Sequence, residues 1–133
     1  MNNKFSAILL TATAALLFSI PSFAHHGNAT LATGKKVVLK GTVTEWLWAN
    51  PHCWLKFDVK DDKGNVVHWV VESSNPGDMI ERGWSKKTFQ PGDTDIITVE
   101  PVKNGNPAGR ILSVVLPNGQ ELSMAYLQPG KAY

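Results

Sequence analysis

Residues 52–74 constrain the fold most strongly, because they carry the complete pattern of a β-hairpin. In residues 52–60, HCWLKFDVK, polar and apolar side chains alternate, as they do in a strand with one buried face. The predicted core face of this strand consists of Cys53, Leu55, Phe57 and Val59. The following DDKGN predicts a three-residue turn with Gly64 in the left-handed conformation. Residues 66–74, VVHWVVESS, then return as a second strand, so the centre of the fold is an antiparallel pair.

The length of this turn determines which residues lie opposite each other. A three-residue loop places Asp58 opposite His68, and it places Trp54 opposite Glu72. These four side chains then share the outer face of the hairpin. The core-facing residues of the returning strand are Val67, Trp69 and Val71. A loop one residue shorter or longer would exchange the two faces.

Three further segments are typical of strands. Residues 37–48 are rich in β-branched and aromatic side chains, and Gly41 within them predicts a bulge or a sharp bend. Residues 94–103 and 110–116 predict two more strands, separated by the loop NGNPAG. Residues 121–127 predict a short extra strand.

A short helix is expected between the third and fourth strands. Asn75 can cap it, Pro76 suits its first position, and Gly83 ends it. The order of elements predicts a mainly β fold, a small five-stranded OB-like barrel with one short helix between strands three and four. A β-sandwich is the alternative, but it normally has about seven strands and no central helix.

Residues 1–24 have the pattern of a secretory signal peptide. Lys4 supplies the positive charge, residues 7–20 form an uncharged apolar run, and SFA places small residues at the cleavage site. A retained membrane anchor is the alternative, but the apolar run is shorter than the about 20 residues that a membrane helix needs. Cleavage after Ala24 would make His25 the first residue of a periplasmic or secreted chain. The predicted organisation is a signal peptide (1–24), an N-terminal arm (25–36), the barrel domain (37–128) and a tail (129–133).

Charge and cysteine content exclude some classes of protein. The 13 basic side chains nearly balance the 11 acidic ones, and Lys4 is lost with the signal peptide. Such a chain lacks the basic patch that nucleic-acid binding requires, so no nucleic-acid partner is expected. Cys53 is the single cysteine, which excludes a disulfide within the chain. We expect it in the core, although a lone thiol in an oxidising compartment can also bind a metal or another chain.

Several motifs resemble a family of small exported bacterial proteins. They are AHH (24–26), LKGTVTEWLWANPH (39–52), VHWVVE (67–72), RGW (82–84) and PGDTDIITVEPVKNGNPAG (91–109). KGTV…NPH and the Pro-Gly-Asp before the fourth strand are the most specific parts, and the resemblance covers nearly all of the exported chain. The family is known only as a domain of unknown function, so the resemblance implies export and a small β-barrel but no activity. Residues 27–34, GNATLATG, depart from its pattern, where an aromatic-containing segment is expected.

His25 is the strongest candidate for binding a metal. After cleavage it would carry an α-amine and an imidazole, which together can chelate one ion and resemble the histidine brace of exported copper proteins. Copper(II) stands at the top of the divalent affinity order and accepts nitrogen ligands in tetragonal geometry. His26 adds a neighbouring imidazole, and His52, in the turn ANPHCW, is the best ligand that the fold could supply. We therefore expect a copper(II) site formed by His25, His26 and His52.

Simpler interpretations exist for each of these histidines. His25 and His26 could belong to an ordinary flexible terminus, and His52 could be a loop histidine that is hydrogen-bonded to the backbone. His68 is expected to pair with Asp58, about 20 Å along the strand from His52, which is too far for a shared ion. Cys53 is adjacent to His52 in a strand and so points to the opposite face.

Tryptophans provide a second hypothesis. Three of the five fall on the outward register near residues 50–52, where exposed aromatic side chains usually indicate binding. The candidate ligand-binding residues are Trp46, Trp48, Asn50 and Trp54. The protein could be a metal-free interaction module that binds an envelope glycan or protein through this face and the loop at residues 104–109. The three tryptophans could instead close an open end of the barrel, while Trp69 and Trp84 are expected in the core.

No motif of a catalytic constellation is present in the sequence. There is no GxSxG, HExxH, CxxC or phosphate-binding loop. The sequence therefore favours a binding protein, whose oligomeric state it does not indicate, over an enzyme.

Overall fold

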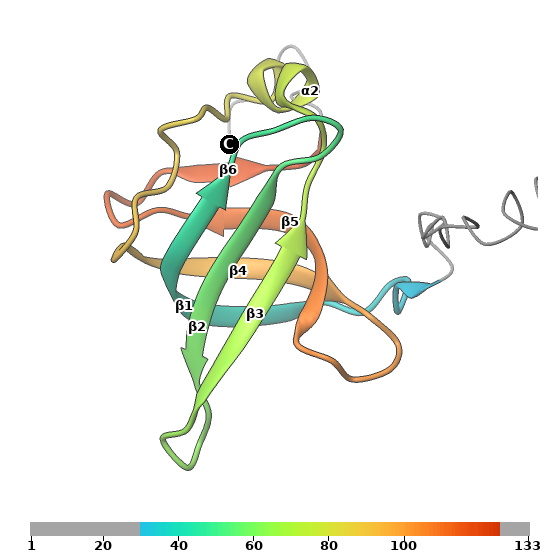
Figure 1. Ribbon diagram of the computed structural model, residues 1–133, viewed down its shortest axis with the longest axis vertical. Coiled ribbons are helices and arrows are strands. Elements are labelled where there is room, and N and C mark those ends of the chain that lie inside the picture. Colours follow the sequence, from blue (N-terminus) through green and yellow to red (C-terminus); the bar gives the residue numbers. More distant parts are fainter. Residues whose placement is uncertain (1–29, 126–133) are drawn as a thin grey trace, which may run out of the picture.

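The computed structural model describes residues 30–125 and shows a barrel with a short helix near one end (Figure 1). The strands are β1 (Val37–Leu47), β2 (Trp54–Lys60), β3 (Val66–Glu72), β4 (Thr94–Pro101), β5 (Ala108–Val115) and β6 (Glu121–Ser123). The helix α2 (Pro76–Glu81) lies between β3 and β4. Within residues 30–125, no helix is long and apolar enough to cross a membrane. The predicted signal peptide and the predicted ligands His25 and His26 lie outside the described residues.

Pairing between β3 and β5 closes the barrel. The strands are hydrogen-bonded in the order β3-β2-β1-β4-β5-β6, and neighbours in this order are antiparallel. Residues 70–72 of β3 also pair in parallel with residues 108–110 of β5, which closes strands β1 to β5 into a ring. β6 pairs further along β5, at residues 113–115. This closed five-stranded barrel, with its helix between β3 and β4, confirms the predicted OB-like fold.

The hairpin has the predicted register. Asp58 pairs with His68, and Trp54 pairs with Glu72. The Asp61 N–H donates to the Asn65 carbonyl at the closing pair, and Gly64 has a φ of 83°. Hydrogen bonds from the Asn65 side chain and backbone hold the pKa of Asp61 below its usual value. The three-residue turn therefore fixes the faces of both strands, as its sequence indicated.

The bulge expected at Gly41 lies further along β1. Gly41 keeps regular pairing with β4, whereas the β1–β2 register shifts between Val43 and Glu45. Glycine is required at position 41 for a different reason, because a Cβ there would lie 2.3 Å from Cδ2 of Phe57. The bulge leaves both Thr44 and Glu45 exposed, so the residues after it change face.

This change of face corrects the prediction for two tryptophans. Trp46 and Trp48 were expected to face outward, but both are partly buried and pack against the core. The ring centroid of Trp46 lies 5.7 Å from that of Trp48 and 5.0 Å from that of Phe89. The indole N–H of Trp46 donates to the Ser85 carbonyl at 3.1 Å. Trp46 therefore helps to anchor the segment between α2 and β4, and Trp48 packs against it.

The core fills the barrel with residues from every strand. Its buried apolar members are Val43, Cys53, Leu55, Phe57, Val71, Met79, Trp84, Phe89, Ile97, Val99, Ile111, Val114 and Leu122. Cys53 is fully buried, which confirms its predicted place and raises the pKa of its thiol. Trp84 is buried and Trp69 is partly buried against the core, as predicted for both.

One carboxyl group lies inside this apolar core. Asp95 of β4 is 1% exposed, and neither of its carboxylate oxygens has a hydrogen-bond partner within residues 30–125. Burial, with a contribution from the charge of Asp93, raises the pKa of Asp95 to about 6. The alternation of TDIITVEP, which buries Ile97 and Val99, also turns Asp95 inward. The charged form of this side chain therefore destabilises the fold.

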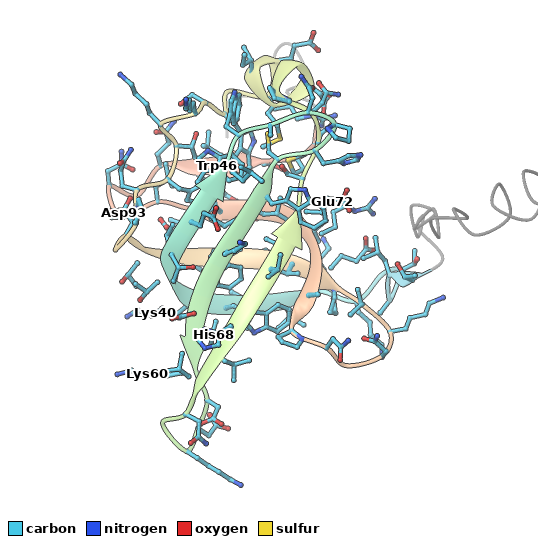
Figure 2. The ribbon with its side chains drawn as sticks, in the orientation of Figure 1. Lys40, Trp46, Lys60, His68, Glu72 and Asp93 are labelled. Atoms are coloured by element: carbon cyan, nitrogen blue, oxygen red, sulfur yellow. The ribbon has the colours of Figure 1, made fainter. Side chains whose placement is uncertain are left out.

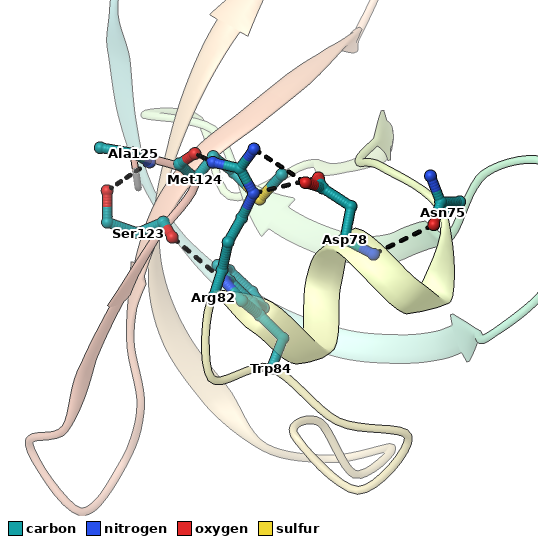
Figure 3. A network of polar contacts seen from close by, with 7 residues as sticks. All are labelled: Asn75, Asp78, Arg82, Trp84, Ser123, Met124 and Ala125. Carbon is teal, nitrogen blue, oxygen red and sulfur yellow. Dashed lines mark hydrogen bonds and ion pairs between the residues drawn. The ribbon is translucent and has the colours of Figure 1, made fainter. Parts of the chain in front are cut away.

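Polar contacts join α2 to the C-terminal strand (Figure 3). Arg82 donates to both carboxylate oxygens of Asp78, each at 3.0 Å, and it also donates to the Met124 carbonyl. The indole N–H of the buried Trp84 donates to the Ser123 carbonyl at 3.2 Å. The short helix is therefore held by tertiary contacts, which it needs because six residues do not form a stable helix in isolation.

Removal of the helix cap should weaken this end of the molecule. The side chain of Asn75 accepts the N–H of Asp78 at 3.0 Å. We expect Asn75→Ala to lower the free energy of unfolding by about 1 kcal/mol, measured by urea titration with tryptophan fluorescence. Asn75→Asp keeps the acceptor and adds negative charge at the helix start, so it should cause little loss. Equal losses in the two variants would show that the cap is not the stabilising contact.

Candidate functional site

A groove runs along the outside of β5, where β3 leaves this strand and β6 joins it. Its volume is about 1420 Å³. The ends of β3 and α2, β6, the β4–β5 loop and the arm before β1 all contribute to its walls. Polar and aromatic side chains in these walls include Thr30, His52, Trp54, Glu72, Asn104 and Asn106. The groove therefore brings together segments from both ends of the described chain.

His52 is held at this groove by two acceptors. Its Nδ1 lies 2.8 Å from Oε1 of Glu72 and 3.1 Å from the carbonyl oxygen of Ser73. The side chains of His52 and Glu72 are 37% and 34% exposed, so the pair is only partly screened by water. The contact with Ser73 is the backbone bond that was the simpler interpretation of His52. The contact with Glu72 adds a negative charge beside the ring.

The backbone around His52 is rigidly bonded. The Cys53 N–H donates to the Ser74 carbonyl, and the Ser73 N–H donates to the Cys53 carbonyl, each at 2.9 Å. The hydroxyl of the buried Ser73 donates to the same Cys53 carbonyl at 3.2 Å. These bonds continue the β2–β3 ladder beyond Trp54. The ring of His52 therefore extends from an ordered segment.

Sequence reasoning placed Glu72 correctly but missed its contact with His52. The register that pairs Trp54 with Glu72 leaves His52 two residues further along, on the same face and diagonal to Glu72. Diagonal neighbours on one face lie within reach of long side chains. The signal was therefore present in the hairpin register, which places Glu72 opposite Trp54.

The arm before β1 is attached beside the groove. The Lys103 N–H donates to the Thr30 carbonyl at 2.9 Å, and Leu31 forms a β-bridge with Val102. The Gly34 N–H donates to Oε1 of Glu100 at 3.2 Å. The arm thus leads the chain along the β4–β5 loop, and Thr30 lines the groove.

The matched part of the chain contains the whole His52–Glu72 site. The family model described as "Family of unknown function (DUF6152)" matches residues 14–111. The chain belongs to this family. The match extends from the predicted signal peptide into β5 and ends before β6. No curated protein and no solved structure matches the chain, so the family match brings no activity to the site.

Within the described part of the chain, the structure does not bring the predicted metal ligands together. Within residues 30–125, no group of three or more His, Cys, Asp or Glu side chains is arranged to hold a metal ion. His52 lies at the groove, while His25 and His26 lie outside the described range. Cys53 points into the core, and its Sγ faces the Ala49 carbonyl at 3.9 Å.

His68 forms the pair predicted for it. Its Nδ1 lies 2.6 Å from Oδ1 of Asp58, and its side chain is 78% exposed. Figure 2 shows His68 on the lower half of β3, toward the β2–β3 turn, whereas Glu72 lies at the other end of the strand. His68 is also not among the residues that line the groove. It therefore provides a second carboxylate–histidine pair that is separate from the candidate site.

Of the three tryptophans in the predicted aromatic face, Trp54 lines the groove, whereas Trp46 and Trp48 do not. Trp54 is partly buried and lines the groove beside Glu72, with which it pairs across the strands. Asn50 is exposed in the β1–β2 loop. Figure 2 shows Trp46 at the end of β1. Its ring packs with that of Phe89, which lies in the segment between α2 and β4. The groove thus offers Trp54, Asn104 and Asn106 as contacts for a larger ligand.

Proposed function

We propose that the protein is an exported copper(II)-binding protein. The signal peptide directs export, and cleavage after Ala24 creates the ligand pair of His25, its α-amine and its imidazole. His52 supplies a third nitrogen from the barrel, and His26 assists. The protein binds the ion and catalyses no reaction of its own.

The observation that supports this proposal is that Thr30 and His52 line the same groove. His25 precedes Thr30 by five positions, which span at most about 18 Å when the chain is extended. The arm is tied to the β4–β5 loop at Thr30 and Leu31, so the reach of the new terminus begins at a wall of the groove. Among the described residues, His52 is the histidine that lines this groove, and it is therefore the barrel ligand that we propose for His25.

The chemistry of the donor set favours copper(II). An α-amine and imidazoles are nitrogen ligands, which copper(II) accepts in tetragonal geometry and binds more tightly than other first-row divalent ions. Each ligand binds in its deprotonated form, so binding should strengthen as the pH rises through the neutral range.

Copper titration of the processed protein, of a form with one extra leading residue and of two histidine variants tests the proposal. We expect the form that starts at His25 to bind one copper(II), with a nitrogen-coordinated electron paramagnetic resonance signal. An added leading alanine removes the chelating α-amine from His25, and His52→Ala removes the ligand from the barrel. Each change should weaken binding at least about tenfold, which corresponds to about 1.4 kcal/mol. His68→Ala is the matched control and should leave the titration unchanged.

Two outcomes would contradict the copper site. Equal affinities for the processed and extended forms would remove the α-amine from the site. An unchanged affinity in His52→Ala would leave copper at the terminus alone, without the barrel. The mass of the exported protein, measured intact, independently tests whether the chain begins at His25.

A metal-free interaction module is the second candidate. Trp54, Asn104 and Asn106 line the groove, and this combination of a ring and amide groups suits a sugar or an extended peptide. In this case soluble peptidoglycan fragments, used as the probe, should change the tryptophan fluorescence, and Trp54→Ala should abolish the change. Copper(II) would then leave the fluorescence unchanged.

A further inference from the structure

The sequence contains two Asn-Gly dipeptides, at residues 104–105 and 118–119, and the structure places them in two different turns. In such a dipeptide the backbone nitrogen of the glycine can attack the side-chain amide carbon of the asparagine, because no Cβ shields that nitrogen. Both dipeptides are exposed, and the glycines have φ angles of 81° and 84°. Each asparagine side chain also accepts the backbone N–H two residues further along, at 3.0 Å and 2.9 Å. The two sites therefore share their chemistry, and a difference in reactivity must come from the surrounding backbone.

Asn118 lies in a tightly bonded turn between β5 and β6. The Leu116 N–H donates to the Gln120 carbonyl at 2.9 Å, which closes a turn of three residues, 117–119. Within this turn the Gly119 N–H donates to the Leu116 carbonyl at 2.8 Å. The nitrogen that would attack is therefore already bonded, and the turn must open locally before it can reach the side chain of Asn118.

Asn104 lies in a longer loop between β4 and β5. The Val102 N–H donates to the Ala108 carbonyl at 3.0 Å, so the loop comprises residues 103–107. The Gly105 N–H has no hydrogen bond of normal length and angle to any residue within 30–125. The attacking nitrogen at this site therefore reacts without first losing a strong backbone bond.

We propose that Asn104 is a site of deamidation, whereas Asn118 is protected by its turn. The Gly105 nitrogen gives its proton to water or hydroxide and forms a bond to Cγ of Asn104. The Cγ–Nδ2 bond then breaks, and Nδ2 takes a proton from water and leaves as ammonia. A second water molecule opens the resulting succinimide ring at one of its two carbonyl carbons, which gives aspartate or isoaspartate at position 104. This inference does not depend on the proposed copper site.

The modification changes one wall of the groove. Asn104 lines the groove, and deamidation replaces its neutral amide by a carboxylate. The neighbouring Lys103 donates its backbone N–H to the Thr30 carbonyl and so attaches the arm. In the isoaspartate product the side-chain carbon enters the main chain, which lengthens the loop next to this bond. Deamidation therefore acts on the groove and on the segment that holds the arm.

Mass spectrometry of the folded protein, sampled during incubation in mildly alkaline buffer, tests the site. Each deamidation replaces NH2 by OH, and fragmentation of proteolytic peptides assigns the mass increase to Asn104 or Asn118. We expect Asn104 to react at least about tenfold faster, a difference of about 1.4 kcal/mol in activation free energy, which is comparable to the net value of one backbone hydrogen bond. Equal rates, or a faster reaction at Asn118, would overturn the inference.

The same measurement in urea tests whether the fold causes the difference. Unfolding removes both turns, so the two asparagines should then react at similar rates. A tenfold difference that persists in urea would mean that the flanking residues, and not the turns, determine the rates, and the proposed protection of Asn118 would be wrong.

Two alanine variants test the assignment and its consequence. Asn104→Ala should abolish the fast mass increase, whereas Asn118→Ala, the matched control, should leave it unchanged. Both side chains are exposed, so neither replacement should unfold the barrel. After incubation, hydrogen exchange of the Lys103 amide should be faster in the wild type and unchanged in Asn104→Ala. A fast mass increase that persists in Asn104→Ala would place the reaction elsewhere, and an unchanged Lys103 amide in the modified wild type would contradict the effect on the arm.

Discussion

The free energy of unfolding of the wild-type protein is expected to fall by about 3 kcal/mol between pH 4 and pH 7 because of Asp95. Asp95→Asn should abolish this fall. Asp95 is 1% exposed, and its carboxylate oxygens lack hydrogen-bond partners within residues 30–125. Its pKa is about 6 in the folded protein, against an ordinary value of 3.8. The folded state therefore holds this proton more tightly than the unfolded state does.

The sign of the effect follows from this difference in proton binding. Below about pH 4, Asp95 is protonated in both states and the folded protein is at its most stable with respect to this group. As the pH rises toward 6, the unfolded state ionises first, and the free energy of unfolding decreases. Above about pH 6 both states are ionised, and the loss is complete. Asparagine stays neutral throughout and should show no such decrease.

Urea unfolding at a series of pH values measures this contribution as the difference between the two proteins. The stability of Asp95→Asn minus that of the wild type should increase with pH from 4 to 6 and then remain constant. Asp61→Leu is a control of opposite sign at lower pH. Hydrogen bonds from Asn65 lower the pKa of the exposed Asp61 from its ordinary 3.8, so its stabilising contribution is complete above about pH 4 and is lost only as the pH falls below that value. Parallel pH profiles for Asp95→Asn and the wild type would show that Asp95 is not buried as the structure places it.

The alternation of side chains predicts most of the barrel because it is a local property. The hairpin register follows from the turn at residues 62–64, and it correctly places Asp58 opposite His68. The OB-like order of elements follows from counting strands on either side of one helix. Closure through the parallel contact of β3 with β5 is not local, and only the analogy with OB-folds anticipated it.

Trp46 and Trp48 show where the local rule fails. A single unpaired residue between Val43 and Glu45 exchanges the two faces for the rest of β1. No residue type at this point identifies the bulge, and Gly41, the apparent marker, serves instead to admit the ring of Phe57. A prediction based on period alone therefore loses its register after the bulge.

The candidate site depends on one contact within the hairpin and on another between segments that are distant in the sequence. His52 with Glu72 is a diagonal pair within one hairpin, so the register contains enough information to find it. The approach of Thr30 to the same groove depends on the arm pairing with the β4–β5 loop, more than 70 residues away in the chain. Nothing in the residues of the arm indicates that partner.

Phe57→Ala should lower the free energy of unfolding by about 3–5 kcal/mol, the largest loss that we expect from a single substitution in this barrel. Phe57 is fully buried, and its ring lies over the backbone of Gly41 and 6.2 Å, centroid to centroid, from the ring of Trp69. Its removal leaves a cavity inside a closed barrel whose paired strands cannot collapse freely. Urea unfolding, followed by fluorescence, measures the loss.

Gly41→Ala should be destabilising on its own and harmless once Phe57 has been removed. In the native barrel the new Cβ would lie 2.3 Å from Cδ2 of Phe57, and relief of this overlap should cost about 1–3 kcal/mol. In the Phe57→Ala background the overlap disappears, and alanine should stabilise slightly, because it restricts the unfolded chain more than glycine does. The two substitutions should therefore show a coupling energy of at least about 1 kcal/mol.

Gly109→Ala provides the matched control for this cycle. Its Cβ would also meet an atom at 2.3 Å, but that atom is the backbone carbonyl oxygen of Glu100, which removal of the Phe57 ring does not displace. The effects of Gly109→Ala and Phe57→Ala should therefore add. Additive effects for Gly41→Ala as well would mean that the ring of Phe57 is not what requires glycine in β1. A coupling confined to Gly41 would establish that this glycine is retained for packing against the ring, since its pairing with β4 is regular and its bulge lies elsewhere.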